Sequence, residues 1–303
     1  MTRFRANCLL LSAGAVWGMG FVAQSTAMDA IGPWTFTAAK FGLAALALAP
    51  LATLEWRRQS AGLSFTTLGW FFVVAMALFL AAITQQIGIV TTTVTNSGFL
   101  TGLYVVLTPI LALLFLRQLP HWVVWPAAAA CFAGIALLGG GSLSTLNTGD
   151  LWTIASAMFW AVQIMLVGTI AASSGRPFLL TFVQFAVTAL AATIGMLAFE
   201  TPALEGLTEA LPEIVYGGVF ATALAFTLQV FGQSHTTPAQ ASIFLSSEAL
   251  FAALFGAIFL SERIAPIGYL GCGLILAAML AVELVPLRDG GQKTMSGKSG
   301  PAQ

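Results

Sequence analysis

Residues 66–88 read TTLGWFFVVAMALFLAAITQQIG and contain no charged side chain. The hydrocarbon core of a membrane is roughly 30 Å thick, and a helix needs about 20 residues to cross it. Inside lipid, a spanning segment must also bond its own backbone N–H and C=O groups, which a helix does. This stretch therefore predicts a membrane-spanning helix, and much of the chain repeats its pattern.

The composition of the whole chain agrees with this prediction. Hydrophobic residue types make up 58% of the 303 residues and charged types only 7%, whereas a soluble domain carries roughly 25% charged residues. The net charge is zero, which gives no basic patch for nucleic acid. The three cysteines, Cys8, Cys131 and Cys272, lie in apolar runs without a C-x-x-C pattern. We interpret them as packing residues and predict no metal site, disulfide or cofactor.

Apolar runs separated by charged residues, Gly or Pro predict ten transmembrane helices. The predicted fold class is therefore an all-α polytopic membrane protein. The ten spans are 7–28, 33–54, 66–88, 95–116, 121–140, 150–171, 178–199, 211–233, 239–260 and 264–285.

The distribution of cations predicts the direction of these spans. Cytoplasmic loops of membrane proteins carry an excess of Lys and Arg. If both termini lie in the cytoplasm, only Arg263 falls outside and only Lys40 lies within a span. Nine cations then lie inside: Arg3, Arg5, Arg57, Arg58, Arg117, Arg176, Arg288, Lys293 and Lys298.

The two halves of the chain resemble each other at a spacing of 143–144 residues. The mates are residues 15–18 and 158–161, 37–41 and 181–185, 84–86 and 227–229, and 115–118 and 259–262. Each half holds five spans, so the second half must enter the membrane in the opposite direction. Inverted repeats are typical of transporters, whose site lies between the two halves.

This repeat divides the chain into predicted domains. The first five-helix half is 7–140, the inverted second half is 150–285, and 286–303 is a polar tail predicted to be disordered and cytoplasmic.

Several stretches resemble a ten-helix member of the drug/metabolite transporter superfamily with two EamA-type repeats. They are Ala15–Gly18, Lys40-Phe41 with the Ala/Leu run after it, Asn96–Val106, Ser247–Leu250, Phe259–Ile264, and the glycines at 268, 271 and 273. The resemblance implies an inner-membrane carrier of small metabolites, often an exporter. Well-known members include bacterial exporters of amino acids, aromatic ones among them. The first half departs from the pattern at Gln118, where the second half has Glu262.

Aromatic and polar residues at mid-depth are the candidates for a central cavity. Trp17 and Trp160 are repeat mates at mid-span, although tryptophan usually lies at the membrane interface. They are predicted to form facing walls of the cavity, or to pack the two halves together. Phe21, Phe99, Tyr104 and Gln163 fall near the same depth.

Two ionisable groups within the spans have two interpretations each. Glu248, in span nine, serves either as a proton site or substrate-ammonium ligand, or as a hydrogen-bonded tie between helices. Lys40, in span two, either extends its long stem outward to the interface or pairs with a carboxylate, exposed carbonyls or substrate.

Gln85 and Gln229 either line a polar entrance or mark interfaces. Ser246 can bond back to its own helix or add polar lining.

These residues favour a carrier that exports small amphipathic metabolites by alternating access. Its substrates are predicted to be neutral or aromatic amino acids, or alternatively hydrophobic cationic drugs. An intramembrane enzyme is disfavoured because H-E-x-x-H, G-x-S-x-G and paired intramembrane aspartates are absent from the sequence. A channel or structural subunit is the remaining alternative. The expected partners are lipid and a small-molecule substrate, and the sequence is compatible with a monomer.

Overall fold

The computed structural model describes residues 1–59, 62–138 and 146–296, and within these ranges it is built of helices and loops, without strands. Nine helical segments of this part of the chain are long and apolar enough to cross a membrane. They are Arg3–Asp29, Pro33–Arg58, Phe65–Ile89, Val94–Leu116, Thr148–Ser174, Pro177–Phe199, Leu211–Gln233, Pro238–Phe259 and Pro266–Val285. The prediction of an all-helical polytopic membrane protein is confirmed.

Several of these segments contain more than one helix. In chain order the elements are α1 (Arg3–Thr26), η1 (Ala27–Asp29), α2 (Pro33–Arg58), α3 (Phe65–Ile89), α4 (Val94–Thr101), α5 (Tyr104–Leu116), α6 (Val124–Leu138), α7 (Thr148–Ser174), α8 (Pro177–Phe199), α9 (Leu204–Glu209), α10 (Leu211–Val215), η2 (Tyr216–Leu224), α11 (Ala225–Gln233), α12 (Pro238–Leu245), α13 (Ser247–Phe259) and α14 (Pro266–Ser296).

The predicted span 121–140 corresponds to the shorter apolar helix α6. Its last residue, Leu138, adjoins residues 139–145, so the predicted Gly139–Gly141 break lies outside the described residues. At the other end of the chain, α14 continues as a helix to Ser296, where the sequence predicts a disordered tail from residue 286. Residues 297–303 lie outside the described part.

Two spans are broken near their middle, at repeat-related places. One span divides into α4 and α5 at Gly102 and Leu103, and the other into α12 and α13 at Ser246. Around Gly102 the backbone tightens, since Val105 N bonds to Gly102 O at 3.0 Å. Ser246 Oγ bonds back to Ile243 O at 2.7 Å, which competes with the helix ladder. These breaks place residues 104 and 248 at the first turn of a new helix.

The helices α2 and α8 are repeat mates that run in opposite directions. Glu200, just after α8, accepts hydrogen bonds from the backbone N–H groups of Trp34 and Thr35 at 2.9 and 2.8 Å. Glu55, near the end of α2, accepts from the backbone N–H of Leu179 at 2.7 Å. The start of each helix therefore lies at the end of the other, as an inverted repeat requires. A carboxylate at a helix start also satisfies otherwise unbonded N–H groups.

A second sign of the repeat is backbone conformation. Arg117 and Ser261, 144 residues apart, are the two non-glycine residues with positive φ in the described ranges, at 52° and 57°. Glu262 follows Ser261 and accepts from the backbone N–H groups of Val94 and Thr95, both at 3.0 Å. Glu262 thus caps α4.

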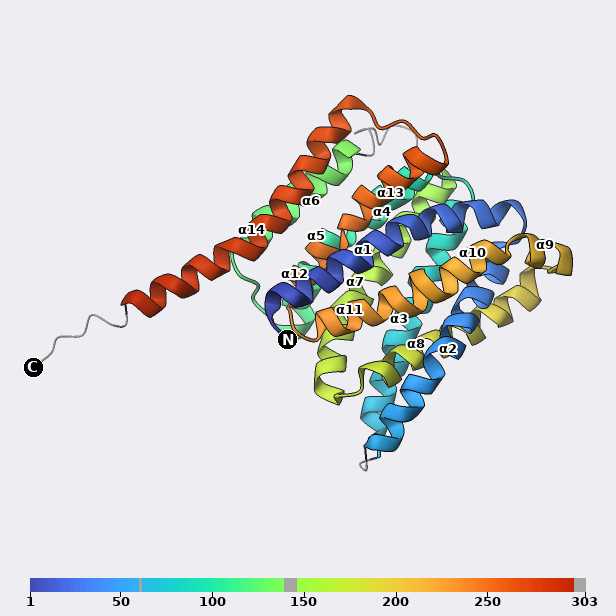
Figure 1. The fold of residues 1–303 in the computed structure, drawn as a ribbon, viewed down its shortest axis with the longest axis horizontal. Helices are drawn as coiled ribbons and strands as arrows, with labels where there is room; N and C mark the ends of the chain where they lie inside the picture. Colours follow the sequence, from blue (N-terminus) through green and yellow to red (C-terminus); the bar gives the residue numbers. More distant parts are fainter. Residues whose placement is uncertain (60–61, 139–145, 297–303) are drawn as a thin grey trace, which may run out of the picture.

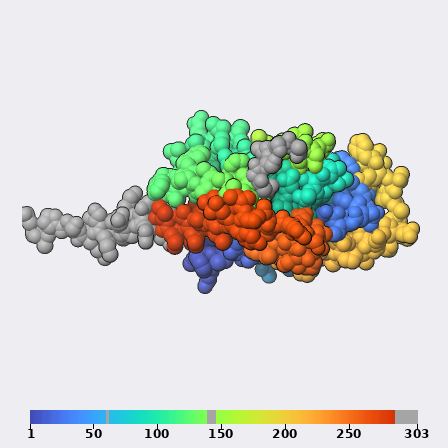
Figure 2. Space-filling view, turned by 90° about the horizontal axis from the view of Figure 1, so that it is seen from above, coloured from blue at the N-terminus to red at the C-terminus, as the bar shows by residue number. Residues whose placement is uncertain are grey.

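The helices α6 and α14 pack against each other on one flank of the molecule, whereas α2 and α8 lie on the opposite flank (Figure 1). In the space-filling view the green surface of α6 adjoins the red surface of α14 (Figure 2). Glycines allow this close approach, because a Cβ on Gly134 would lie 2.6 Å from Gly271 O. The remaining spans between these two flanks surround the candidate site.

Candidate functional site: a cavity between the two halves

A cavity of about 590 Å³, counting the part that is open to the outside, lies between the two halves. Its walls come from α1, α2, α3, α5, α7, η2, α11 and α13. The lining residues are Trp17, Gly20, Phe21, Gln24, Lys40, Phe41, Ala82, Gln85, Tyr104, Trp160, Ile164, Gly217, Ala221, Thr222, Phe226 and Glu248.

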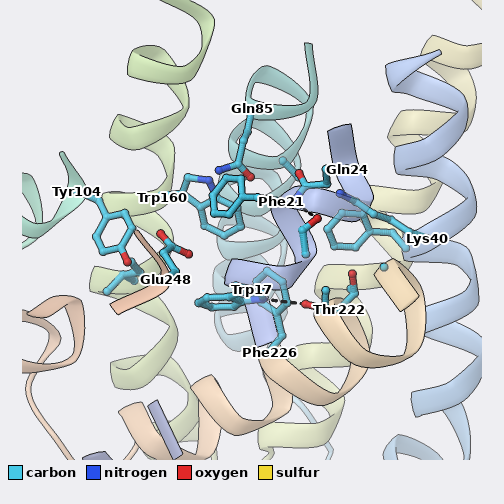
Figure 3. A pocket seen from close by; sticks show the side chains of 16 residues that line it. Trp17, Phe21, Gln24, Lys40, Gln85, Tyr104, Trp160, Thr222, Phe226 and Glu248 are labelled. Atoms are coloured by element: carbon cyan, nitrogen blue, oxygen red, sulfur yellow. Dashed lines mark hydrogen bonds between the residues drawn. The ribbon is translucent and has the colours of Figure 1, made fainter. Parts of the chain in front are cut away.

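Trp17, Trp160 and Phe226 form an aromatic wall of the cavity, and in the view of Figure 3 these rings lie between Glu248 and Lys40. The ring centroids of Trp17 and Trp160 are 6.3 Å apart, and those of Trp17 and Phe226 are 4.9 Å apart. Trp17 and Trp160 are repeat mates, so each half contributes one indole. Trp17 Nε1 donates to Ala221 O at 2.8 Å. Trp160 Nε1 is buried and has no hydrogen-bond partner among the described residues.

The acceptor of the Trp17 hydrogen bond lies in an unusual helical segment. Residues Tyr216–Leu224 form a π-helix, which is rare and often found at functional sites. This segment brings Gly217, Ala221 and Thr222 to the cavity. The π-helical stretch therefore shapes one side of the cavity and orients Trp17.

Lys40 lies on one side of the aromatic wall. Its side chain is buried, with 6% of the residue exposed. Nζ donates to Gln86 Oε1 at 3.2 Å and lies 4.9 Å from the centroid of the Phe36 ring. In the part of the chain that the structure describes, no carboxylate lies within ion-pair distance of Lys40; the ion pair found there joins Arg3 and Glu283. Lys40 therefore does not extend to the interface, and its buried amine borders the cavity.

Glu248 lies on the other side of the aromatic wall (Figure 3). It is in the first turn of α13, because the break at Ser246 starts a new helix there. A helix start favours a negative charge, which offsets part of the cost of burying this carboxyl group. The side chains of Glu248 and Tyr104 point toward one another. The Tyr104 hydroxyl therefore lies beside the Glu248 carboxyl group and interacts with it directly.

The cavity lies between mid-membrane and one side of the molecule. Gln24, Lys40 and Gln85 belong to helix ends that meet the connections 27–32 and 90–93. Toward the opposite side the helices are in direct contact, since a Cβ on Gly232 would lie 2.8 Å from Leu10 Cγ. At that side, α1 and α11 therefore pack directly against each other.

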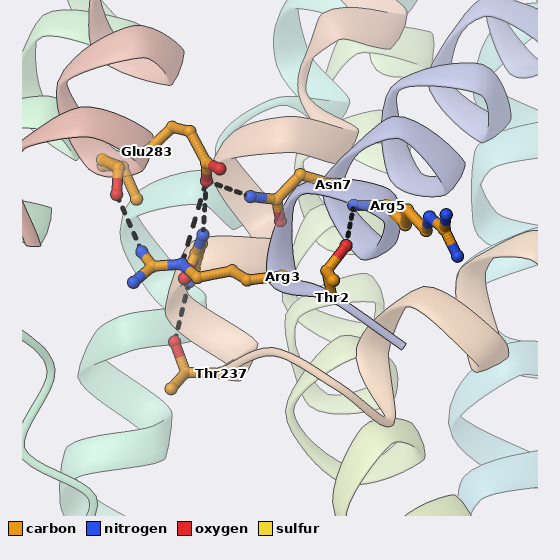
Figure 4. A network of polar contacts seen from close by, with 8 residues as sticks. Thr2, Arg3, Arg5, Asn7, Thr237 and Glu283 are labelled. Carbon is orange, nitrogen blue, oxygen red and sulfur yellow. Dashed lines mark hydrogen bonds and ion pairs between the residues drawn. The ribbon is translucent and has the colours of Figure 1, made fainter. Parts of the chain in front are cut away.

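A polar network holds that opposite side together (Figure 4). Arg3 and Glu283 form an ion pair at 3.8 Å, and Arg3 Nη2 also donates to Val282 O at 2.8 Å. Asn7 Nδ2 and Gln240 Nε2 both donate to Glu283 Oε2. The network joins the start of α1 to α12 and α14.

Comparisons with known proteins identify this arrangement. The model of the EamA-like transporter family matches residues 4–140 and 147–284, once in each half. The chain belongs to the EamA-like transporter family.

Relatives agree with this assignment. An uncharacterized transporter of Archaeoglobus fulgidus is 30% identical over 286 residues, covering 93% of this chain and 87% of the relative. A solved crystal structure of a protein aligns with this chain at a TM-score of 0.75. The alignment covers 95% of this chain and 99% of the chain in that structure. At 16% sequence identity, that likeness shows the fold alone.

Most of the residues predicted from the sequence surround the cavity of this EamA-like transporter. They are Trp17, Phe21, Tyr104, Trp160, Glu248, Lys40 and Gln85. Tyr104 and Phe99 are both buried, although their spacing does not place them on one face of a regular helix. The break at Gly102 and Leu103 changes the helical phase between them.

Four predicted residues lie away from the cavity. Phe99 packs in the apolar core. Ser246 lies at the helix break, with Oγ 3.0 Å from Cys131 Sγ. Gln163 and Gln229 bond to each other and are fully buried. Hydrogen bonds within the second half hold the two glutamines, whereas Phe99 and Ser246 contact residues of both halves.

Several lining residues were not predicted, chiefly Gly20, Gln24, Phe41, Thr222 and Phe226. The sequence does contain a signal for Gln24, because Trp17, Phe21 and Gln24 have the 4- and 3-residue spacing of one helical face. No comparable signal marks Thr222, since the π-helical segment changes which residues share a face.

Proposed function

We propose that this transporter is a carrier in a bacterial inner membrane that exports small amphipathic metabolites, first of all neutral or aromatic amino acids. It would do so by alternating access between its two inverted halves, with both termini in the cytoplasm. Under this orientation, the end of the bundle that holds Gln24, Lys40 and Gln85 would face outward, and the Arg3–Glu283 network would lie on the cytoplasmic side.

The observation that carries this proposal is the chemistry of the cavity. Two indoles and Phe226 offer stacking surface for an apolar or aromatic side chain, worth about 0.5–1.5 kcal/mol per ring pair beyond area burial. Lys40 and Glu248 add one basic and one acidic side chain, both buried and neither in an ion pair within the described ranges. Ionisable groups inside a membrane protein are costly and commonly functional. A zwitterion with an apolar side chain complements this combination.

A counterflow assay in liposomes tests the proposal. Purified protein is reconstituted in vesicles loaded with one unlabelled amino acid, and uptake of the same labelled amino acid is measured across a broad panel. We expect accumulation for neutral and aromatic amino acids. Absence of flux across the whole panel, with a hydrolytic activity in its place, would contradict the carrier proposal.

A hydrophobic cationic drug is a second candidate substrate. Glu248 beside aromatic rings favours it, because a cation is attracted both to a carboxylate and to ring faces. Lys40 in the same cavity opposes it. Counterflow of labelled tetraphenylphosphonium distinguishes the two candidates when it is measured against protein-free vesicles, because this cation also crosses bilayers by itself. An amino-acid carrier will add nothing to the uptake of the protein-free vesicles.

A further inference from the structure

The two halves place polar side chains at equivalent buried positions. Lys40 on α2 is the repeat mate of Gln184 on α8, at an offset of 144 residues. Gln86 on α3 is the mate of Gln229 on α11, at an offset of 143. All four are buried. The inverted repeat therefore contains this polar site twice, once in each half, and the two copies carry different side chains.

In the second half a third side chain fills this site. Gln163 Nε2 donates to Gln184 Oε1 at 3.1 Å, and Gln229 Nε2 donates to Gln163 Oε1 at 3.0 Å. The planar carboxamide of Gln163 thus bridges the two mates. All three side chains have 0% exposure, so this site is closed by the protein itself.

In the first half the mate of Gln163 is Gly20, which has no side chain. Gly20 and Lys40 line the cavity, as does the neighbouring Gln24. Lys40 Nζ instead contacts Gln86 directly, at 3.2 Å. In the first half, the position equivalent to the Gln163 carboxamide therefore borders the open cavity.

The chemistry of the two mates indicates what fits in that place. Gln184 presents an oxygen to Gln163 and so receives an N–H. Lys40 presents only donors, so a group bound against Lys40 must offer oxygen where Gln163 offers nitrogen to Gln184. A planar group with oxygen at both positions is a carboxylate.

We propose that the substrate's carboxylate binds over Gly20 and against Lys40, at the place that the Gln163 carboxamide fills in the other half. This inference rests on the proposed function and adds the orientation of the substrate. Gln24 Oε1, buried and without a partner in the described ranges, accepts from the ammonium group. The side chain then extends toward Trp17 and Trp160.

The test compares two probes that differ at one group. Binding of L-phenylalanine and of L-phenylalaninamide, which keeps the ring and the ammonium but has a neutral carboxamide, is measured by calorimetry on the full-length protein in nanodiscs. We expect the wild type to prefer the acid. In Lys40→Gln, which makes the first site like the second, we expect acid affinity to fall roughly 10- to 100-fold, as for loss of a charged hydrogen bond. The variant should then bind the amide at least as well as the acid.

Two further variants complete the design. Arg57→Gln removes a cation from an exposed position of the same helix and should leave the preference for the acid unchanged. Gly20→Gln introduces the mate's side chain and should weaken acid binding by occupying the site. If Gly20→Gln does not fold, the result for Lys40→Gln alone tests the proposed carboxylate site.

The outcomes separate the two proposals. If the wild type binds phenylalanine and Lys40→Gln keeps the wild-type preference for the acid, the carboxylate site is wrong while the amino-acid carrier stands. If the wild type binds neither probe and transports no amino acid, both proposals are wrong.

Discussion

At the scale of single residues, the cavity depends on side chains that break the apolar pattern at mid-membrane. Trp17 and Trp160 could be recognised in the sequence because they are repeat mates at an unusual depth. The structure adds that they are not equivalent. Trp17 Nε1 bonds to the π-helical segment at Ala221 O, whereas Trp160 Nε1 is buried without a partner in the described ranges.

The position of both indoles at the cavity leads to one prediction. Trp17→Ala and Trp160→Ala should each raise the KM for an aromatic substrate at least about threefold, because each removes a stacking surface worth roughly 1 kcal/mol. Trp125→Ala, on the exposed face of α6, is the matched control and should change KM little. Initial rates of counterflow measure all three, and equal effects would mean that the indoles serve packing alone.

Gln163 shows that the sequence does not predict the direction in which a side chain points from its helix. Gln163 was predicted to line the cavity from its depth alone. Depth follows from position along a span, but the direction of a side chain around the helix axis depends on its partners. Gln184 and Gln229 hold Gln163 within the second half. Its repeat mate Gly20 does line the cavity, and this was not predicted because glycine has no side chain.

At the scale of elements, carboxylates at helix starts tie the two halves together. Glu55, Glu200 and Glu262 each cap a helix of the opposite half. The sequence shows these residues only as charges at span ends, which predict sidedness but no contact. Glu262 has a structural reason for being acidic, since it satisfies the N–H groups at the start of α4.

Loss of one such cap should be measurable. We expect Glu200→Gln to lower the free energy of unfolding by about 1–2 kcal/mol, because Trp34 and Thr35 lose a charged acceptor at the start of α2. The melting temperature of the purified protein in detergent measures this. Glu205→Gln removes a charge from an exposed position on the neighbouring α9 and serves as the control. Equal melting temperatures for the two variants would show that the Glu200 cap contributes no stability.

At the scale of the whole molecule, sidedness follows from the proposed orientation. Thr208, on α9, should lie outside and Ser173, at the end of α7, should lie inside. Both are exposed. A membrane-impermeant maleimide added to intact cells should label Thr208→Cys and leave Ser173→Cys unlabelled until the membrane is opened. The parent protein controls for labelling of Cys8, Cys131 and Cys272, and the reverse pattern would overturn the orientation.

The sequence by itself determined which segments are spans and that two halves repeat. Both follow from properties that run along the chain: about 20 apolar residues per span, and a fixed offset between similar stretches. Only the tertiary structure decided which polar groups meet. The breaks at Gly102 and Ser246 and the π-helical segment at 216–224 change which side chains share a helical face. Contacts between the two halves then cover some of these faces and leave others at the cavity. Lys40, Gly20 and Glu248 border one cavity for that reason, while Gln163 does not.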